Sequence, residues 1–256
     1  MEYGYIIAGF IVGLLVGLTG VGGGSLMTPN LMFFFSIKPA VAVGTDLLYA
    51  SITKTAGIFA HGKLGNIDWR IVKLLSAGSI PASLATIIFL RNINIDSTEA
   101  IATIKFSLGI ALIFTSIAVL LRTKLMTLLA EGEWIQPKYV APLTVILGII
   151  LGGLVTLTSV GAGALGVTTL IILYPHKKLT TIVGTDIAHA VPLTLVAGLG
   201  HASLGTINYE LLGVLLIGSI PGIWIGSHLS ARVTEKWIRI ALSAILIYVG
   251  LKLVLA

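Results

Sequence analysis

Long apolar stretches, separated by short polar or glycine-rich connections, fill almost the whole chain. A helix needs about 20 mainly apolar residues to cross a bilayer, and most of the stretches approach that length. The stretches at 24–36 and 160–174 are shorter, and each follows a glycine cluster instead of a charged loop. We interpret these two as half-helices or re-entrant hairpin arms near the membrane midplane. The predicted segments are 5–20, 24–36, 40–60, 70–90, 103–121, 139–158, 160–174, 180–200, 210–229 and 237–255.

The composition favours an all-α, polytopic membrane protein. Hydrophobic residues make up 56% of the 256 residues and charged residues only 10%, whereas roughly a quarter of an ordinary soluble domain is charged. The mean hydropathy of +1.05 agrees. These values exclude a typical soluble globule and a disordered chain. The absence of cysteine excludes disulfides, a thiol nucleophile and cysteine-based metal sites.

The second half of the chain repeats the first. When the chain is shifted by 140 residues, segment 43–81 aligns with 183–221, and 14 of the 39 positions are identical. The identities include polar and turn residues, since both segments begin with VGTD and end with GSIP. A shift of 139 aligns TGVGGG at 19–24 with TSVGAG at 158–163. An internal repeat of this length predicts two equivalent halves.

The two halves are expected to have opposite orientations in the membrane. Each half has five segments, an odd number, so the second copy enters from the other side, which predicts an inverted-topology repeat. We place the first repeat at 1–122, a cytoplasmic linker at 123–138 and the second repeat at 139–256.

The distribution of Lys and Arg predicts the orientation. Alternate connections carry 11 of these residues on one side and 4 on the other, and Lys54 lies inside a segment. Because cytoplasmic loops of membrane proteins are enriched in Lys and Arg, the richer side is predicted to be cytoplasmic and both termini extracytoplasmic. We therefore attribute the net charge of +6 to topology, and we predict no nucleic-acid partner.

Each half contains a glycine-rich interruption followed by a short apolar stretch. Glycine lets the backbone approach a ligand, and a helix N-terminus offers free N–H groups and partial positive charge to an anion. We interpret the interruptions as a candidate anion site; close helix packing through small residues is the alternative. The candidate substrate-binding residues are Thr19, Gly20, Val21, Gly22, Gly23, Gly24 and Ser25 in the first half and Thr158, Ser159, Gly161 and Gly163 in the second.

Asp46 and Asp186 lie at equivalent positions of the two VGTD blocks, inside apolar segments. An ionisable side chain at membrane depth is a functional candidate by default, so both are candidates for proton coupling. Capping of a broken helix is the alternative. Lys54, about 12 Å along a helix from Asp46, is a candidate source of positive charge. His189, three residues after Asp186 and on the same helical face, is a candidate proton relay or a packing histidine.

Nothing in the sequence specifies catalysis. The chain has only ten acidic residues, no His and acid cluster with metal-ligand spacing and no Gly-x-Ser-x-Gly motif. We predict no catalytic residue, no metal site and no cofactor, and a permease rather than an enzyme. The alternatives are a channel on the same fold, an intramembrane enzyme that uses Ser25 or Ser159 with His189, and a scaffold or receptor subunit.

The duplicated motifs, taken in order, resemble the sulfite exporter TauE/SafE family of membrane permeases. The resemblance rests on TGVGGGSLMTP at 19–29, TSVGAGALGV at 158–167, the VGTD blocks and the GSIP helices, and it extends from about residue 5 to 255. It implies a bacterial or archaeal inner-membrane permease for small anions, typically sulfur-containing ones such as sulfite or organosulfonates.

The resemblance also adds Thr45 and Thr185, in the two G-T-x blocks, to the candidate substrate-binding residues. Many members of the family have Ser or Asn where this chain has Asp46 and Asp186. Two added acids favour proton coupling or a different cargo. The partners expected are therefore a small anion, protons and the lipid bilayer.

Overall fold

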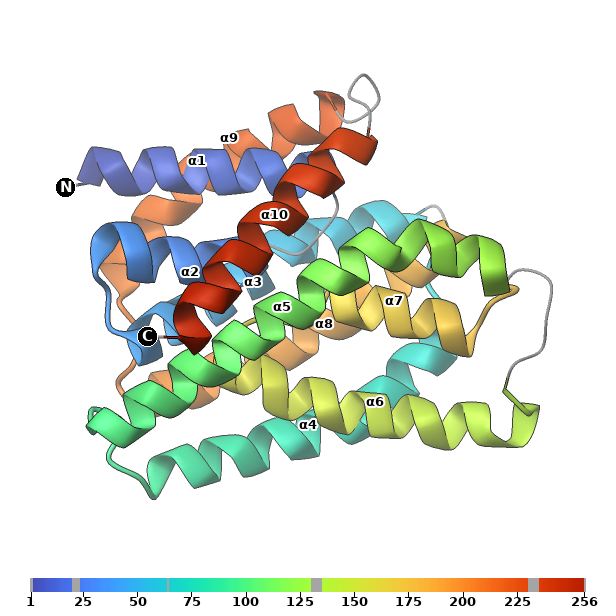
Figure 1. The fold of residues 1–256 in the computed structure, drawn as a ribbon, viewed down its shortest axis with the longest axis horizontal. Coiled ribbons are helices and arrows are strands. Elements are labelled where there is room, and N and C mark those ends of the chain that lie inside the picture. The colour runs from blue at the N-terminus through green and yellow to red at the C-terminus, as the bar shows by residue number, and fades with distance from the viewer. Residues whose placement is uncertain (1, 20–23, 64, 130–134, 230–234, 256) are drawn as a thin grey trace.

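The computed structural model is all-helical, which confirms the predicted fold class. The structure describes residues 2–19, 24–63, 65–129, 135–229 and 235–255, and no strand occurs in these ranges. The helices, drawn in Figure 1, are α1 (Glu2–Thr19), α2 (Gly24–Phe35), α3 (Pro39–Lys63), α4 (Trp69–Arg91), α5 (Thr98–Leu129), α6 (Pro137–Thr158), α7 (Ala164–Leu173), α8 (Leu179–Ser203), α9 (Tyr209–Leu229) and α10 (Glu235–Val254).

The apolar stretches predicted most of these helices to within a few residues. Within the described residues, six helices are long and apolar enough to cross a membrane, namely α4, α5, α6, α8, α9 and α10. The two short helices that the sequence predicted are α2, with 12 residues, and α7, with 10. The chain is therefore a multi-pass membrane protein that combines these longer helices with two short ones.

The largest difference from the sequence prediction concerns α5. The apolar segment was expected to end at 121 and the linker to begin at 123, but α5 continues to Leu129. Leu, Met and Lys dominate residues 123–129, and neither glycine nor proline occurs there. These are good helix formers, so the helix continues after its hydropathy has fallen.

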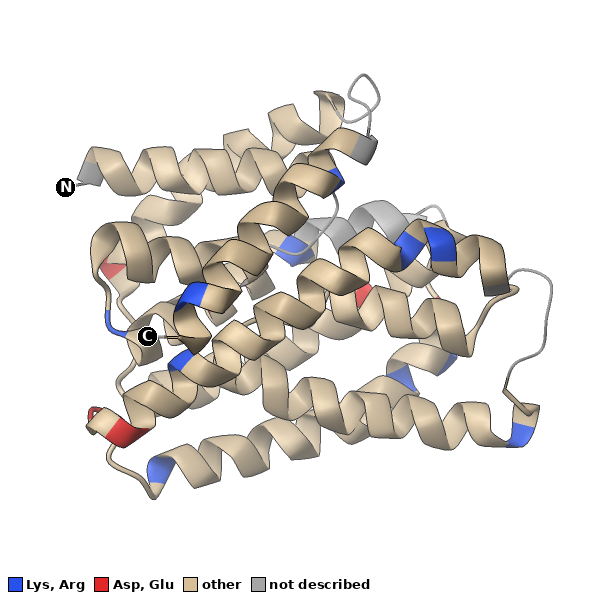
Figure 2. Cartoon of the chain, in the orientation of Figure 1, with Lys and Arg blue, Asp and Glu red and all other residues tan. Residues whose placement is uncertain are grey.

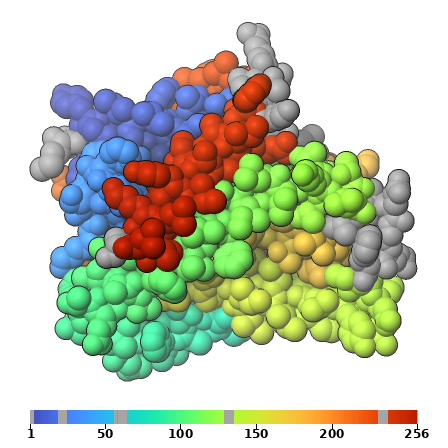
Figure 3. All heavy atoms as spheres, viewed as in Figure 1, coloured from blue at the N-terminus to red at the C-terminus, as the bar shows by residue number. Residues whose placement is uncertain are grey.

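Helices from the two halves of the chain pack in pairs. α1 packs along α9, and α4 packs along α6; in Figure 1 these pairs form the top and the bottom of the molecule. α5 packs against α10, and α3 packs against α8. In the space-filling view of Figure 3, α10 and α5 lie across the front. Every one of these pairs combines one helix from each half.

Glycines bring the outer pairs into backbone contact. A Cβ atom on Gly13 of α1 would lie 2.8 Å from the Cα of Ser219 in α9, and a Cβ atom on Gly152 of α6 would lie 2.8 Å from the Cα of Ser79 in α4. Only glycine fits at such distances, so small residues set the helix spacing, as they do in many membrane helix pairs. The two contacts are equivalent under the shifts that align the halves.

The repeated GSIP motifs belong to the same contacts. Pro81 and Pro221 lie inside α4 and α9 without ending either helix. A Cβ atom on Gly78 or Gly218, the first residue of each motif, would collide with a backbone carbonyl oxygen of the partner helix. Each motif therefore begins with a notch that accepts the neighbouring helix.

Both termini lie toward the same end of the molecule. In Figure 1 the N and C labels are on the left, and the end of α5 and the start of α6 are on the right. Figure 2 shows most Lys, Arg, Asp and Glu positions toward the two ends of the horizontal axis, with mainly uncharged helix between them. This distribution fits helices that cross a membrane along that axis.

Candidate functional site

The second glycine-rich interruption is a buried break between two helices. α6 ends at Thr158, and α7 begins at Ala164. Between them Ser159, Gly161 and Gly163 have φ angles of 59°, 124° and 122°, a region that glycine enters without steric strain. The Thr158 hydroxyl accepts a hydrogen bond from the next-but-one backbone N–H at 3.1 Å. An irregular backbone is thus enclosed by protein, which is the condition for tolerating it at membrane depth.

The first interruption lies largely outside the described residues. Gly20, Val21, Gly22 and Gly23 are not among them, while Thr19 ends α1 and Gly24 begins α2. Ser25, in the first turn of α2, is buried. A substrate-binding role for these seven residues stays a prediction.

The two aspartates are buried inside continuous helices. The exposed fraction is 0% for Asp46 and 1% for Asp186. They lie in α3 and α8, which begin seven residues earlier, at Pro39 and Leu179. Neither aspartate therefore caps the helix that carries it.

Each aspartate packs against the short helix of its own half. The Thr28 hydroxyl in α2 donates to Oδ2 of Asp46 at 2.6 Å. The backbone N–H of Gly163, at the start of α7, lies beside the carboxylate of Asp186, and a Cβ atom on Gly166 would collide with Oδ1 of Asp186. The partial positive charge of a helix N-terminus stabilises a carboxylate at this position. In both aspartates Oδ1 is buried without a hydrogen-bond partner among the described residues.

Lys54 brings positive charge from the first half to the break in the second half. Its Nζ donates to the carbonyl oxygen of Ala162 at 3.2 Å, and its charge interacts with those of Asp186 and Asp46. Within the described residues it forms no direct ion pair with either carboxylate, which agrees with the predicted separation from Asp46. The equivalent residue in the second half is Thr194, whose hydroxyl bonds within α8, so only one half supplies this cation.

The side chains of Thr45 and Thr185 each accept a hydrogen bond from a loop between two helices of the opposite half. The Thr185 hydroxyl accepts from the backbone N–H of Asp68 at 2.9 Å, and the Thr45 hydroxyl accepts from the backbone N–H of Asn208 at 3.1 Å. Each bond maps onto the other under the 140-residue shift. The structure gives both threonines a structural hydrogen bond, and their contact with substrate stays a prediction.

His189 contacts α4 rather than Asp186. Its Nε2 lies 2.8 Å from the hydroxyl of Ser79, whereas its Nδ1 and Oδ1 of Asp186 are both buried without a partner among the described residues. The equivalent residues in the other half are Tyr49 and Ser219, whose hydroxyl groups are both buried without a hydrogen-bond partner among the described residues. A proton-coupling role for His189 stays a prediction.

Sequence reasoning missed three partners of the candidate ionisable residues. Thr28, Ser79 and the carbonyl group of Ala162 all contact candidate residues from elsewhere in the chain. Ser79 gave a signal, because it is a repeated polar residue inside an apolar helix. A backbone carbonyl group gives none.

The assembled site has one ammonium group and two carboxylates, buried next to a broken helix. Charges interact more strongly in such an environment than in water, so the protonation of either carboxylate changes the local field that an ion meets. Among the described residues, no cluster of three or more His, Asp or Glu is placed to hold a metal ion.

Apolar spanning helices that enclose ionisable residues beside a broken helix define a class of protein, the polytopic membrane transporters. Comparison with known sequences agrees, because residues 5–253 match the family described as "Sulfite exporter TauE/SafE". The chain belongs to this family, and it is a membrane transporter and not an enzyme.

Three curated relatives are similar over nearly their full length. The chain is 41% identical to "Probable membrane transporter protein YjnA" of Bacillus subtilis, over 99% of this chain and 100% of that protein. It is 32% identical to a probable membrane transporter protein of Methanocaldococcus jannaschii, over 98% of this chain and 94% of that one. It is 25% identical to YunE of Bacillus subtilis, which carries the same description, over 97% and 96% of the two chains. No solved structure matches.

Proposed function

We propose that this transporter moves small anions across the plasma membrane, with sulfite, thiosulfate or an organosulfonate as the substrate class and protons as the coupling ion. The observation that carries the proposal is the position of Lys54, whose ammonium group bonds to the break before α7 and interacts with two buried carboxylates. The family description supports sulfur anions. The curated relatives are named for transport alone.

Competition between an anion and the carboxylates explains the coupling. When Asp46 and Asp186 are both ionised, their two negative charges compensate Lys54 and repel an anion. When one carboxylate carries a proton, the positive charge of Lys54 and the N-terminus of α7 are free to bind the anion. Anion and proton then bind together and cross together.

The substrate contacts follow from the same geometry. Backbone N–H groups at a helix start bind oxyanions well, and the positive φ angles at Gly161 and Gly163 bring the backbone there close to Lys54. We place the anion between this break and its equivalent in the first half, residues 19–25.

The two halves, 1–122 and 139–256, are proposed to be inverted repeats joined by a cytoplasmic linker at 123–138, with both termini extracytoplasmic. The reciprocal glycine contacts and the reciprocal threonine bonds support this arrangement, because each maps onto the other when the halves are exchanged. Rocking of one half against the other then exposes the centre to each side in turn.

Uptake into liposomes that contain the purified protein tests the proposal. Sulfite, thiosulfate, sulfate, sulfoacetate and a carboxylate control are each measured with and without an imposed pH gradient. Saturable uptake of a sulfur anion, accelerated by an inward proton gradient, is expected. Flux that neither saturates nor responds to the gradient indicates a channel, and uptake of the carboxylate alone contradicts the substrate class.

A further inference from the structure

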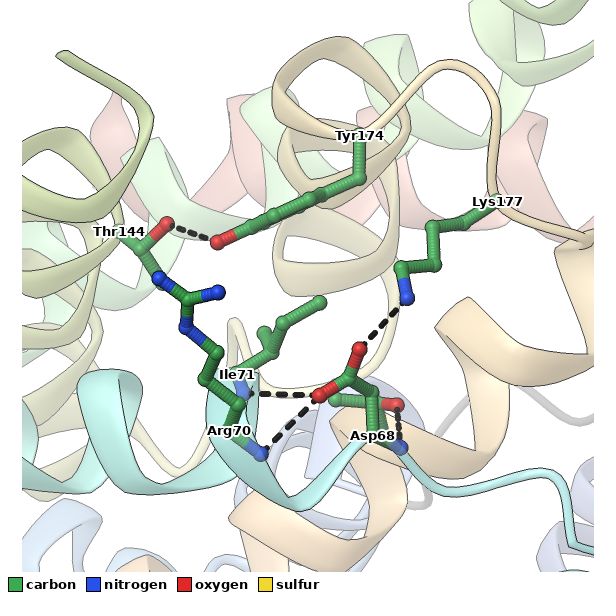
Figure 4. Close-up of polar contacts among 7 residues, drawn as sticks. Asp68, Arg70, Ile71, Thr144, Tyr174 and Lys177 are labelled. Atoms are coloured by element: carbon green, nitrogen blue, oxygen red, sulfur yellow. Dashed lines mark hydrogen bonds and ion pairs between the residues drawn. The ribbon is translucent and has the colours of Figure 1, made fainter. Parts of the chain in front are cut away.

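A cleft away from the buried aspartates opens where the two halves meet at the helix ends. Its volume is about 470 Å³, and it lies between the start of α4, the start of α6 and the connection from α7 to α8. Its polar lining includes His176 and, labelled in Figure 4, Asp68, Arg70, Tyr174 and Lys177. These connections are on the side that the Lys and Arg distribution predicts to be cytoplasmic.

An ion pair closes one edge of the cleft and joins the halves. Nζ of Lys177 lies 2.6 Å from Oδ2 of Asp68, and 42% of the lysine side chain is exposed. Oδ1 of Asp68 accepts from the backbone N–H groups of Arg70 and Ile71 at 3.0 and 3.3 Å, so the same carboxylate caps α4. Asp68 belongs to the first half, and Lys177 belongs to the second.

The described residues that line the cleft carry more positive than negative charge. Figure 4 shows Arg70 extending from α4 toward Thr144 and Tyr174, whose hydroxyl groups lie 2.8 Å apart. Within the described part of the chain, the guanidinium group of Arg70 forms no ion pair. Arginine presents several N–H donors in a plane that fits two oxygens of an oxyanion. Among the described residues that line the cleft, Asp68 is the one acid, against the two cationic side chains of Arg70 and Lys177.

The equivalent position in the other half lacks this ion pair. Asn208 replaces Asp68 and caps α9 in the same way, because its Oδ1 accepts from the backbone N–H of Leu211 at 2.9 Å. The remaining ion pair among the described residues, Lys38 with Asp96, lies within the first half and is more than 60% exposed on both side chains. Capping therefore does not require an aspartate at 68, and the charge has a further use.

We propose that this cleft is an anion-binding vestibule in which a small oxyanion competes with Asp68 for Lys177. The anion binds between Arg70 and Lys177, and Lys177 leaves Asp68 as it does so, which breaks the ion pair between the halves at this entrance. The side chains of Lys177 and Asp68 are 42% and 20% exposed, so solvent screens their attraction, and an oxyanion that also contacts Arg70 is able to replace the carboxylate. The inference rests on the proposed function for the identity of the anion.

Protection of a single thiol tests the vestibule without any transport. The chain has no cysteine, so Ala141→Cys places one thiol in the α6 wall of the cleft. The rate of maleimide labelling of the purified full chain is measured as sulfate or methanesulfonate replaces gluconate at constant ionic strength. Both probe anions are expected to slow labelling in a saturable way.

Charge variants in the same background identify the binding groups. Lys177→Gln is expected to raise the half-protecting sulfate concentration by about tenfold, and Arg70→Gln is expected to raise it as well. Asp68→Asn is expected to lower it several-fold, because the competitor is removed while the cap is kept, as in Asn208. Asp96→Asn is the matched control, since it makes the same charge change at a distant exposed pair and is expected to have no effect.

Absence of protection overturns the inference, and so does equal protection in the parent, Lys177→Gln and Asp68→Asn proteins. Thermal melting of each variant shows whether it is folded. The result is separable from the proposed function. Protection without any flux in liposomes supports the vestibule and contradicts anion transport. Proton-coupled flux without protection supports anion transport and contradicts the vestibule.

Discussion

The second half has a threonine, Thr194, at the position equivalent to Lys54. The substitution Lys54→Thr therefore makes the two halves identical at this position. It removes one unit of positive charge and the 3.2 Å hydrogen bond to the carbonyl oxygen of Ala162. It leaves Asp46 and Asp186 in place, so the centre changes from one cation and two acids to two acids alone. Anion binding is therefore expected to weaken strongly.

The size of the effect follows from Coulomb's law. Two unit charges about 4 Å apart interact by about 4 kcal/mol at an effective dielectric constant of about 20, and every 1.4 kcal/mol corresponds to a tenfold change in affinity. Roughly a thousandfold loss of anion affinity is therefore the upper bound. Because the bound anion is also desolvated, we expect at least about a tenfold rise in the KM for uptake.

The assay is initial-rate uptake of sulfite or thiosulfate into liposomes over a wide range of concentrations. Thr194→Val is the matched control, because it removes a hydroxyl that bonds only within α8 and is expected to leave the KM unchanged. An unchanged KM in a folded Lys54→Thr protein would refute the assignment of Lys54 to the anion site.

Three further predictions follow from other contacts. Asp46→Asn is expected to flatten the pH dependence of uptake, since it removes one of the two carboxylates proposed to bind the coupled proton. An unaltered pH profile would indicate that Asp46 has only a structural role beside Thr28. Gly152→Val is expected to destabilise the protein by about 1–3 kcal/mol or more through overpacking, seen as a lower melting temperature, because its Cβ meets the backbone of α4. Gly153→Val is its control, since the nearest atom to that Cβ is 3.7 Å away, and equal melting temperatures would contradict the close α4–α6 contact. Burial raises the pKa of Asp68, but the hydrogen bonds that it accepts, first that from Lys177, outweigh this and hold its pKa below the usual value. The contribution of Asp68 to stability is thus present above the unfolded-state pKa and is lost as the pH falls through the lower folded-state pKa. Asp68→Asn is therefore expected to reduce the loss of stability on acidification below about pH 4. Identical acid unfolding curves for the two proteins would argue against the ion pair.

The sequence predicted the helices well because hydropathy and segment length are local properties. The starts of α3, α4, α6, α8, α9 and α10 lie within about two residues of the predicted ones. The end of α5 was predicted less well, since a helix is able to continue through residues such as Lys124 that are helix formers without being apolar.

The partners at the centre were harder to predict, because they join distant parts of the chain. The i, i+3 spacing put Asp186 and His189 on one face of a helix, yet Nε2 of His189 bonds to Ser79, 110 residues away. Likewise Lys54 contacts a carbonyl group 108 residues away. A single sequence contains no record of such pairs, although the internal repeat did mark Ser79.

The pairing of α1 with α9 has a consequence for biogenesis. About 190 residues separate the end of α1 from the start of α9, and synthesis at about 5–20 residues per second takes roughly 10–40 s to cover them. During that interval α1 lies in the bilayer with its glycine face against lipid or another temporary neighbour. The first helix to be inserted is therefore among the last to reach its final partner, and substitutions on its glycine face are expected to slow assembly at the ribosome-bound stage as well as to weaken the finished protein.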